Sequence, residues 1–249
     1  MVPGLSVDDL DMDLALSVMY EYCEKLKRAP VTRETLPTLM REQGLLVAES
    51  ERDGITAGAV LLFGKAPQEI FSHAVVSVTE DGKKREIYDG NLITQHRKLL
   101  EKIESVDVNP LLKVKKRRQH SERTAYPPRA LVELLVNMLV HRDYEIAEPA
   151  TIDIRQGAEI IFSNPGGLTH KLKGRIRVAT DGRFTLSESL TDQRNPSVCD
   201  IFFGISAMER AGTGLMDVNQ LMMESGGASA FYDIPNKHEA RIAPPHASA

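Results

Sequence analysis

Residues 130–140 read ALVELLVNMLV, the most apolar helical segment that the sequence analysis identifies. Nine of its eleven residues are apolar and lie all round a helix, so the segment is predicted to be buried on nearly every face. The exceptions are Glu133 and Asn137, and His141 follows four residues later. Positions four apart differ by about 40° around a helix, so the three form one polar stripe. Because an unpaired buried carboxylate costs several kcal/mol, the stripe must meet a cavity, a metal ion or polar partners.

The polar stripe has two explanations at the level of this one helix. It can line a ligand site, with the three side chains pointing into a cavity. It can also belong to a buried polar network, in which Glu133 pairs with a neighbour such as Arg142 or with the backbone of a strand. The residues of the helix alone leave both explanations open.

Two glycine-rich turns follow the helix in the chain. Asn164-Pro165-Gly166-Gly167 comes directly after an expected strand, and Gly212-Thr213-Gly214 directly precedes an expected helix, 214–224. A helix that begins at glycines presents free N–H groups and the positive end of its dipole, which suits phosphate. The ordered set of a Glu/Asn helix, a strand with a glycine turn and a glycine turn at a helix start therefore favours the ligand site.

The other segments predict an α+β protein. Apolar periodicity indicates further helices at 8–28, 33–43 and 91–105. Alternation and turn signals indicate strands at 45–49, 57–64, 73–79, 84–88, 150–156, 158–163 and 239–243. Residues 168–207 look polar and irregular, with an apolar patch only at 198–205. We expect two units, a small N-terminal α/β unit at 1–122 and a second domain at 123–249.

A dense basic run lies next to this boundary. Residues 111–123 read LLKVKKRRQHSER and are expected to form a linker or an exposed strand. The run supplies five cations as candidates for contact with DNA, which are Lys113, Lys115, Lys116, Arg117 and Arg118. The alternative is a solvated surface segment, because short charge runs are common on soluble proteins.

Composition and charge exclude several classes of protein. The formal net charge is −4, so binding of nucleic acid would have to be local. No apolar run approaches the roughly 20 residues of a membrane helix, so no membrane partner is expected. The acidic N-terminus does not have the pattern of a signal peptide, and Cys23 and Cys199 lie far apart and match no metal spacing. These features favour a cytoplasmic protein with reduced thiols.

Taken together, these segments resemble the GHKL ATPases, the group of gyrase, MutL, the ninety-kilodalton heat-shock chaperones and histidine kinases. Glu133 and Asn137 resemble the E-x-x-x-N box of that group. The two glycine turns resemble its D-x-G-x-G adenine turn and its second glycine box. The chain is most similar to bacterial transcriptional regulators that carry a Schlafen-type AlbA-like domain and are related to the RecG helicase. The stretches similar to those regulators are AGAVLLFGKAPQ (57–68), ELLVNMLVHRDY (133–144), IIFSNPGGL (160–168), RNP (194–196) and ERAGTGLMDV (209–218).

The resemblance implies that residues 123–249 form a GHKL-type (Bergerat-like) α/β sandwich that binds ATP and Mg²⁺ and hydrolyses ATP slowly. Glu133 would act as the general base, and Asn137 would coordinate Mg²⁺ through its side-chain oxygen. His141 and Arg142 could reach phosphate, although His141 can equally cap the helix. The residues expected around the base and the phosphates are Asn164, Gly166, Gly167, Gly212, Thr213 and Gly214.

One departure from the group concerns adenine. Asn164 stands where most GHKL proteins have an aspartate, and its amide oxygen can still accept a hydrogen bond from the adenine amino group, without the help of a charge. Arg194 and Asn195 stand where a lid over the nucleotide would be, or they form a salt-bridged loop. No G-x-x-x-x-G-K-S/T sequence occurs in the chain, so the resemblance does not extend to P-loop motors.

A competing interpretation is a regulator without catalytic activity. Such a protein would associate with DNA or act as a scaffold, and its nucleotide pocket would be degenerate. The basic run at 113–118 favours this interpretation. GHKL domains also commonly work in pairs, so a homodimer is expected as a third possibility.

Overall fold

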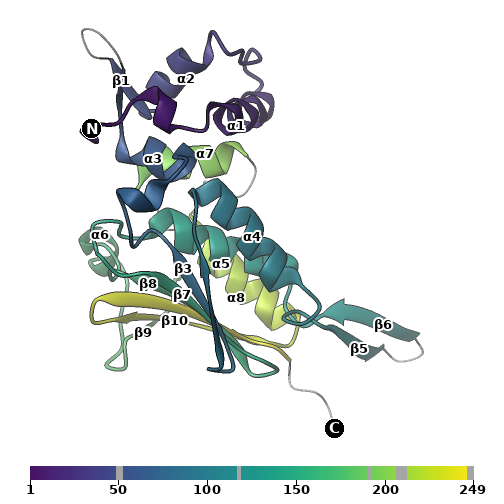
Figure 1. The fold of residues 1–249 in the computed structure, drawn as a ribbon. Coiled ribbons are helices and arrows are strands. Elements are labelled where there is room, and N and C mark those ends of the chain that lie inside the picture. The colour runs from purple at the N-terminus through teal and green to yellow at the C-terminus, as the bar shows by residue number, and fades with distance from the viewer. Residues whose placement is uncertain (49–52, 117–118, 190–191, 206–211, 246–249) are drawn as a thin grey trace.

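A single mixed sheet of seven strands forms the base of the protein (Figure 1). The computed structural model describes residues 1–48, 53–116, 119–189, 192–205 and 212–245. From edge to edge the strands are β4 (Lys84–Tyr88), β3 (Val76–Glu80), β7 (Ala150–Arg155), β8 (Glu159–Pro165), β11 (Lys237–Ala243), β10 (Ala228–Ile234) and β9 (Arg183–Phe184). Strands β3 and β7 are parallel, and the other neighbouring pairs are antiparallel.

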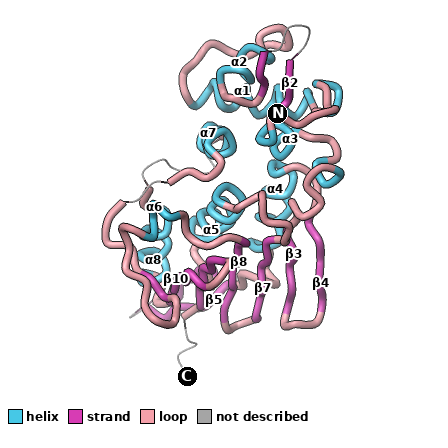
Figure 2. The backbone as a smooth tube through the Cα atoms, turned by 90° about the vertical axis from the view of Figure 1, so that its left-hand side faces the viewer, coloured by secondary structure: helices cyan, strands magenta, loops and turns pink. Residues whose placement is uncertain are grey.

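Three helices cover one face of this sheet. They are α4 (Leu92–Glu104), α5 (Pro128–His141) and α8 (Gly214–Glu224), and α5 packs between the other two (Figures 1 and 2). Strand β7 alternates buried Ala150, Ile152 and Ile154 with more exposed residues, as expected for a strand with one face on the core. The fold is therefore α+β, and α5 with its apolar surroundings lies at the centre of the core.

A helical layer built mainly by the N-terminal segment sits at the end of α4 and α5 (Figure 1). It contains η1 (Val7–Asp9), α1 (Met12–Lys25), α2 (Leu36–Glu42), the antiparallel pair β1 (Leu46–Ala48) and β2 (Asp53–Ile55), α3 (Ala57–Phe63) and η2 (Pro67–Glu69). Helix α7 (Pro196–Gly204) comes from far along the sequence and packs against α1, α3 and α5. The layer is thus shared by segments from both halves of the chain.

The sheet crosses the boundary that the sequence analysis puts between residues 1–122 and 123–249. Strands β3 and β4 come from the first segment, and β3 pairs directly with β7 from the second. Leu99 on α4 and Leu135 on α5 also belong to one hydrophobic core. The N-terminal segment therefore completes the sheet of the second segment.

Most of the segment 57–64, where a strand is expected, forms the helix α3, which ends at Phe63. Thr56 caps α3, because its side chain accepts a hydrogen bond from the Ala59 amide. All residues from Ala59 to Phe63 are buried, so the segment shows no polar face. A short run that is apolar throughout has no period that separates a buried helix from a buried strand, which explains the error.

The region expected to be irregular, 168–207, contains short elements. These are α6 (His170–Lys173), the two-residue strand β9 and α7. Strand β10 was also not expected. The other helix predictions are close to the observed bounds, and the helix expected at 214–224 begins and ends as α8 does.

The basic run builds most of an antiparallel hairpin, β5 (Leu111–Lys116) and β6 (Gln119–Thr124). This hairpin stands out from the body of the protein near the ends of α4 and α8 (Figure 1). Among the described helices, none has the length and apolar composition needed to cross a membrane.

Candidate functional site

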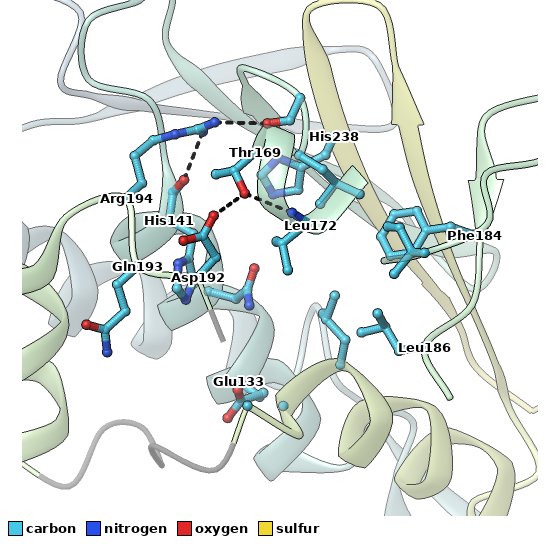
Figure 3. Close-up of a pocket in the computed structure, with 17 residues that line it drawn as sticks. Glu133, His141, Thr169, Leu172, Phe184, Leu186, Asp192, Gln193, Arg194 and His238 are labelled. Carbon is cyan, nitrogen blue, oxygen red and sulfur yellow. Dashed lines mark hydrogen bonds between the residues drawn. The ribbon is translucent and has the colours of Figure 1, made fainter. Parts of the chain in front are cut away.

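The polar stripe on α5 lines a cavity. Between Ala130 and Val140 the helix is buried except at Val132, Glu133 and Asn137, which are half-buried. Glu133, Asn137 and the half-buried His141 all belong to the lining of the same cavity (Figure 3). The cavity therefore lies beside the face of α5 that carries the polar stripe.

This cavity has a volume of about 130 Å³ and a lining with two characters. Its apolar end is made by Leu168, Leu172, Ile176, Phe184, Leu186 and Leu215. Its polar end is made by Glu133, Asn137, His141, Asp192, Gln193, Arg194 and His238 (Figure 3). An elongated ligand with an apolar part and a polar part is the chemistry that such a lining suits.

Arg194 and Asn195 bind the C-terminal end of α5. The guanidinium of Arg194 donates from Nη1 to the His141 carbonyl (3.3 Å) and from Nη2 to the Gly167 carbonyl (3.1 Å). Nδ2 of Asn195 lies 2.8 Å from two more carbonyl oxygens, those of Val140 and Arg142. These groups satisfy carbonyls that a helix end leaves without partners. The pair therefore forms the cap of α5, while Arg194 also faces the cavity.

Arg194 also has an acidic neighbour. Its Nε lies 3.7 Å from Oδ2 of Asp143, and both side chains are partly exposed. Of the two alternatives for this segment, the structure therefore contains the salt-bridged loop. The loop nevertheless contributes the side chains of Asp192, Gln193 and Arg194 to the cavity lining.

Two histidines face the cavity in the neutral form. The pKa of His141 is lowered to about 4, chiefly by burial and in part by nearby His238 and Arg194, while Asp192 opposes this shift. Burial also lowers the pKa of His238, and its Nδ1 lies 3.1 Å from the Gly166 carbonyl. Since a carbonyl only accepts, Nδ1 carries the proton and Nε2 is left as an acceptor. Neither ring supplies positive charge at neutral pH, so His141 does not cap α5 as a cation.

The glycine turn after β8 packs too closely for side chains. Gly166 has φ of +79°, and a Cβ there would lie 2.8 Å from the Cβ of Asp143. A Cβ on Gly167 would lie 2.6 Å from Oδ1 of Asp233, which accepts a hydrogen bond from the Leu168 amide (2.8 Å). Gly167 lines the cavity, whereas Gly166 lies behind it.

The start of α8 meets the carboxylate of Glu133. A Cβ on Gly214 would lie 2.7 Å from Cδ of Glu133 and closer still to Oε1. A carboxylate beside the first turn of a helix interacts favourably with the helix dipole. The first turn of α8 was the predicted contact for phosphate. In this structure the carboxylate of Glu133 lies at that position. Gly212 and Gly214 both contribute to the cavity lining.

Arg142 is not available to a ligand, contrary to the sequence analysis. Its side chain is 1% exposed and donates to the carbonyls of Val75 (3.0 Å), Glu148 (2.5 Å) and His73. Burial lowers the pKa of its guanidinium. The residue fastens the end of α5 to the segment before β3, so its role is structural.

Asn164 and Thr213 lie beside the cavity instead of lining it. Asn164 is 2% exposed, its Nδ2 donates to the Met138 carbonyl (2.8 Å), and its Oδ1 has no hydrogen-bond partner among the described residues. It lines a smaller hollow that shares Asn137 and His238 with the cavity. Thr213 donates to Oδ2 of Asp217 (3.0 Å) and lines a neighbouring groove along α8, which shares Phe184, Leu186 and Leu215 with the cavity.

Several lining residues had no role in the sequence analysis, and His238 is the clearest case. It alternates with Ala240 and Ile242 on β11, and this period of two puts all three on the inner face of the sheet. That alternation could have predicted that His238 faces the core. No local pattern predicts the positions of Asp192 and Thr169, because their hydrogen bond joins two loops 23 positions apart.

No group of three His, Cys, Asp or Glu side chains in the described part of the chain could hold a metal ion. A magnesium ion beside Asn137 would therefore take most of its oxygen ligands from phosphate and water, as Mg²⁺ commonly does.

Among the basic-run residues, Lys113 is exposed on β5 with Lys115 and Lys116 in the same strand, whereas Arg117 and Arg118 lie outside the described residues.

Comparison with solved structures supports the fold. The chain is similar to the DIP2311 protein from Corynebacterium diphtheriae, with a TM-score of 0.69 and 18% sequence identity. The match covers 98% of this chain and 47% of that protein, so this chain spans about half its length. Neither a model of a known protein family nor a curated protein matches the sequence.

Proposed function

We propose that the cavity binds ATP together with Mg²⁺, in the manner of the GHKL ATPases, and that the protein hydrolyses ATP slowly. One observation carries the proposal. Glu133 and Asn137 from α5, Gly167 from the turn after β8, and Gly212 and Gly214 at the start of α8 converge on one cavity. These segments follow one another along the chain in the order that the GHKL resemblance implies.

The orphaned acceptor of Asn164 supports adenine as the base. Oδ1 of Asn164 is buried and lacks a partner among the described residues, and the other end of the amide is held by the Met138 carbonyl. A buried acceptor without a donor is costly, so a ligand with an amino group would gain from meeting it. The exocyclic amino group of adenine is such a donor, and it would have to enter the smaller hollow beside the cavity that Asn164 lines.

The charges of the cavity support a ligand that arrives with a cation. The described lining contains the carboxylates of Glu133 and Asp192 and one guanidinium, Arg194, while the two histidines are neutral. A triphosphate alone would meet a slightly negative surface. Bound Mg²⁺ would neutralise phosphate charge, and Asn137 is the oxygen donor in reach of it from α5.

Within this proposal the residues of the chain have separate tasks. Glu133 holds and deprotonates the attacking water, a task that suits a carboxylate in a partly dry site. Asn137 orients the metal-bound phosphates. Gly167 and Gly212 let backbone groups approach the ligand closely, and Gly214 lets the start of α8 approach the Glu133 carboxylate. The cavity of about 130 Å³ is smaller than typical ligand sites of roughly 300–1,000 Å³. Part of the nucleotide would therefore lie outside it, or the lining would open.

Thermal denaturation with and without Mg²⁺-ATP tests binding. At a ligand concentration of about 100 times Kd, mass action stabilises the protein by about 2.7 kcal/mol, which raises Tm by roughly 5–10 °C for a chain of this size. Asn137→Ala should abolish the Mg²⁺-dependent part of the shift. Glu104→Ala, at an exposed position on α4, serves as the control. A wild-type Tm that does not respond to Mg²⁺-ATP refutes the proposal.

Phosphate release tests hydrolysis separately. The Glu133→Ala variant should still bind the nucleotide but should not release phosphate, because Glu133 acts on the attacking water and does not contact the adenine. Equal phosphate release by wild type and Glu133→Ala would show that the protein is not the hydrolase that we propose.

The β5–β6 hairpin supports a second candidate function, contact with nucleic acid. The hairpin stands away from the body (Figure 1) and carries Lys113, Lys115 and Lys116 on one strand. A projecting arm with this lysine-rich sequence, on a protein with a net charge of −4, concentrates positive potential locally. The affinity for duplex DNA should fall steeply as the salt concentration rises. Replacing these three lysines by glutamine should reduce the slope of log K against log salt concentration by about three. An unchanged slope would exclude the hairpin.

The resemblance also leads us to propose that the protein forms a homodimer. Analytical ultracentrifugation with and without Mg²⁺-ATP measures the association directly. A monomer at micromolar concentration under both conditions would contradict it.

A further inference from the structure

Helix α7 is flanked by residues of the cavity. Gln193 and Arg194 lie three and two residues before its first residue, Pro196, and Gly212 and Gly214 follow it in the chain. The helix itself lies in the N-terminal layer, where it packs against α1, α3 and α5. The helix therefore contacts both α5, which lines the cavity, and the N-terminal helices α1 and α3.

The N-terminal end of α7 is fixed to the cavity. Asn195, the residue before the helix, holds the carbonyls of Val140 and Arg142 at 2.8 Å each. Arg194 holds the carbonyls of His141 and Gly167, and so bridges α5 to the glycine turn across the polar end of the cavity. A movement of α7 along or away from α5 would pull both residues out of these contacts.

The C-terminal end of α7 is fixed to α1. Nζ of Lys25 donates to the Phe203 carbonyl at 2.5 Å and lies 4.1 Å from the centre of the Phe203 ring. A cation at this end of a helix is favoured by the dipole and by the ring. Next to it, Gly204 touches the ring of Tyr22, and a Cβ on Gly204 would lie 2.8 Å from Cε2 and Cγ of that ring and closer still to Cδ2.

We infer that α7 couples α1 to the cavity, so that Lys25, through α7, is a remote positioning residue for Arg194 and Asn195. Closely packed interiors transmit a displacement instead of absorbing it, and α7 has fixed contacts at both ends. The helical layer thereby becomes a regulatory element for the cavity. By linkage, the free energy by which the contacts between α1 and α7 favour ligand binding equals the free energy by which the bound ligand stabilises those contacts. The ligand readout rests on the proposed nucleotide binding, and the readout without ligand does not.

Two measurements on Lys25→Met test the inference. The first is the Kd for Mg²⁺-ATP by calorimetry, and the second is the amide chemical shifts of Gly167 and Gly214 in the ligand-free protein. Lys25→Met should weaken binding about fivefold and move both resonances. Lys25→Arg, which keeps a cationic donor, should restore wild-type values. Lys98→Met, an exposed lysine on α4, is the matched control and should change neither readout.

Each outcome decides the inference. A folded Lys25→Met protein with wild-type affinity and unmoved Gly167 and Gly214 resonances overturns it. If wild type does not bind Mg²⁺-ATP, the proposed function fails, and the two amide resonances alone decide the coupling. If Lys25→Met does not fold, Phe203→Leu, which removes the ring and keeps the carbonyl, is measured in its place by the same criteria.

Discussion

Replacing Gly214 by alanine tests the close contact between the start of α8 and the carboxylate of Glu133. An added Cβ would lie 2.7 Å from Cδ of Glu133 and 3.2 Å from its Cγ, with Oε1 closer still. Since carbon atoms pack best at roughly 3.5–4.0 Å, the Glu133 side chain must retreat by about 1 Å. The substitution therefore displaces the proposed general base without removing it.

Two opposing effects set the size of the stability change. Overpacking of a well-packed site costs about 1–3 kcal/mol, whereas alanine in place of a helical glycine gains about 0.5–1 kcal/mol. The net expectation is a loss of about 0–2.5 kcal/mol in the free energy of unfolding. For a chain of this size that lowers Tm by at most roughly 10 °C.

A double-mutant cycle with Glu133→Ala isolates the contact. Urea denaturation would be measured for wild type, both single variants and the double variant. In the Glu133→Ala background the clash is absent, so Gly214→Ala should be neutral or stabilising, with a coupling of at least about 1 kcal/mol between the two positions. Gly174→Ala is the control, because its Cβ would meet only atoms at 3.7 and 3.8 Å.

The same variant should affect function. A displacement of about 1 Å at a reacting group can reduce the rate about a hundredfold, so phosphate release should fall while Mg²⁺-ATP binding weakens less. Equal destabilisation by Gly214→Ala in both backgrounds would refute the contact. Full phosphate release by Gly214→Ala would refute the position assigned to Glu133.

Three further predictions concern the support of the cavity. Arg142→Met leaves three buried carbonyls without their donor and should lower the free energy of unfolding by about 3–5 kcal/mol, measured by urea denaturation, and a loss below about 1 kcal/mol would contradict the structural role. His141 has its folded pKa at about 4 and an ordinary value of 6.5, so the unfolded chain takes up the proton first. The contribution of His141 to stability should therefore be constant above about pH 6.5 and fall by on the order of 2–3 kcal/mol towards pH 4. His141→Gln should remove that part of the loss, and an unchanged loss in this variant would show that the ring is charged in the folded protein. Asn195→Ala should cost about 1–2 kcal/mol and weaken Mg²⁺-ATP binding, whereas an effect on stability with unchanged Kd would limit Asn195 to the helix cap.

Local patterns in the sequence determined much of the architecture. The helix at 128–141, its polar stripe and the glycine turns on either side of the irregular region could be predicted, because each depends on spacing within one element. The periods of 3.6 and 2 residues also predicted the α+β class and most helix bounds. Residues 57–64 could not be assigned correctly, because a run buried on every side shows neither period.

Long-range contacts decided the rest. That β3 pairs with β7 across the expected domain boundary depends on contacts between distant segments, which neither segment reveals alone. The spacing predicted which face of α5 carries Glu133, but only the folded chain put Gly214 against its carboxylate. Arg142 and His141 are neighbours with the same apparent potential to meet phosphate, yet tertiary structure buries the first among carbonyls and turns the second, neutral, towards the cavity. Helical periodicity determines the direction in which each side chain points from its own helix. Burial and hydrogen-bond partners come from segments distant in the chain, and they determine the charge and the role of that side chain.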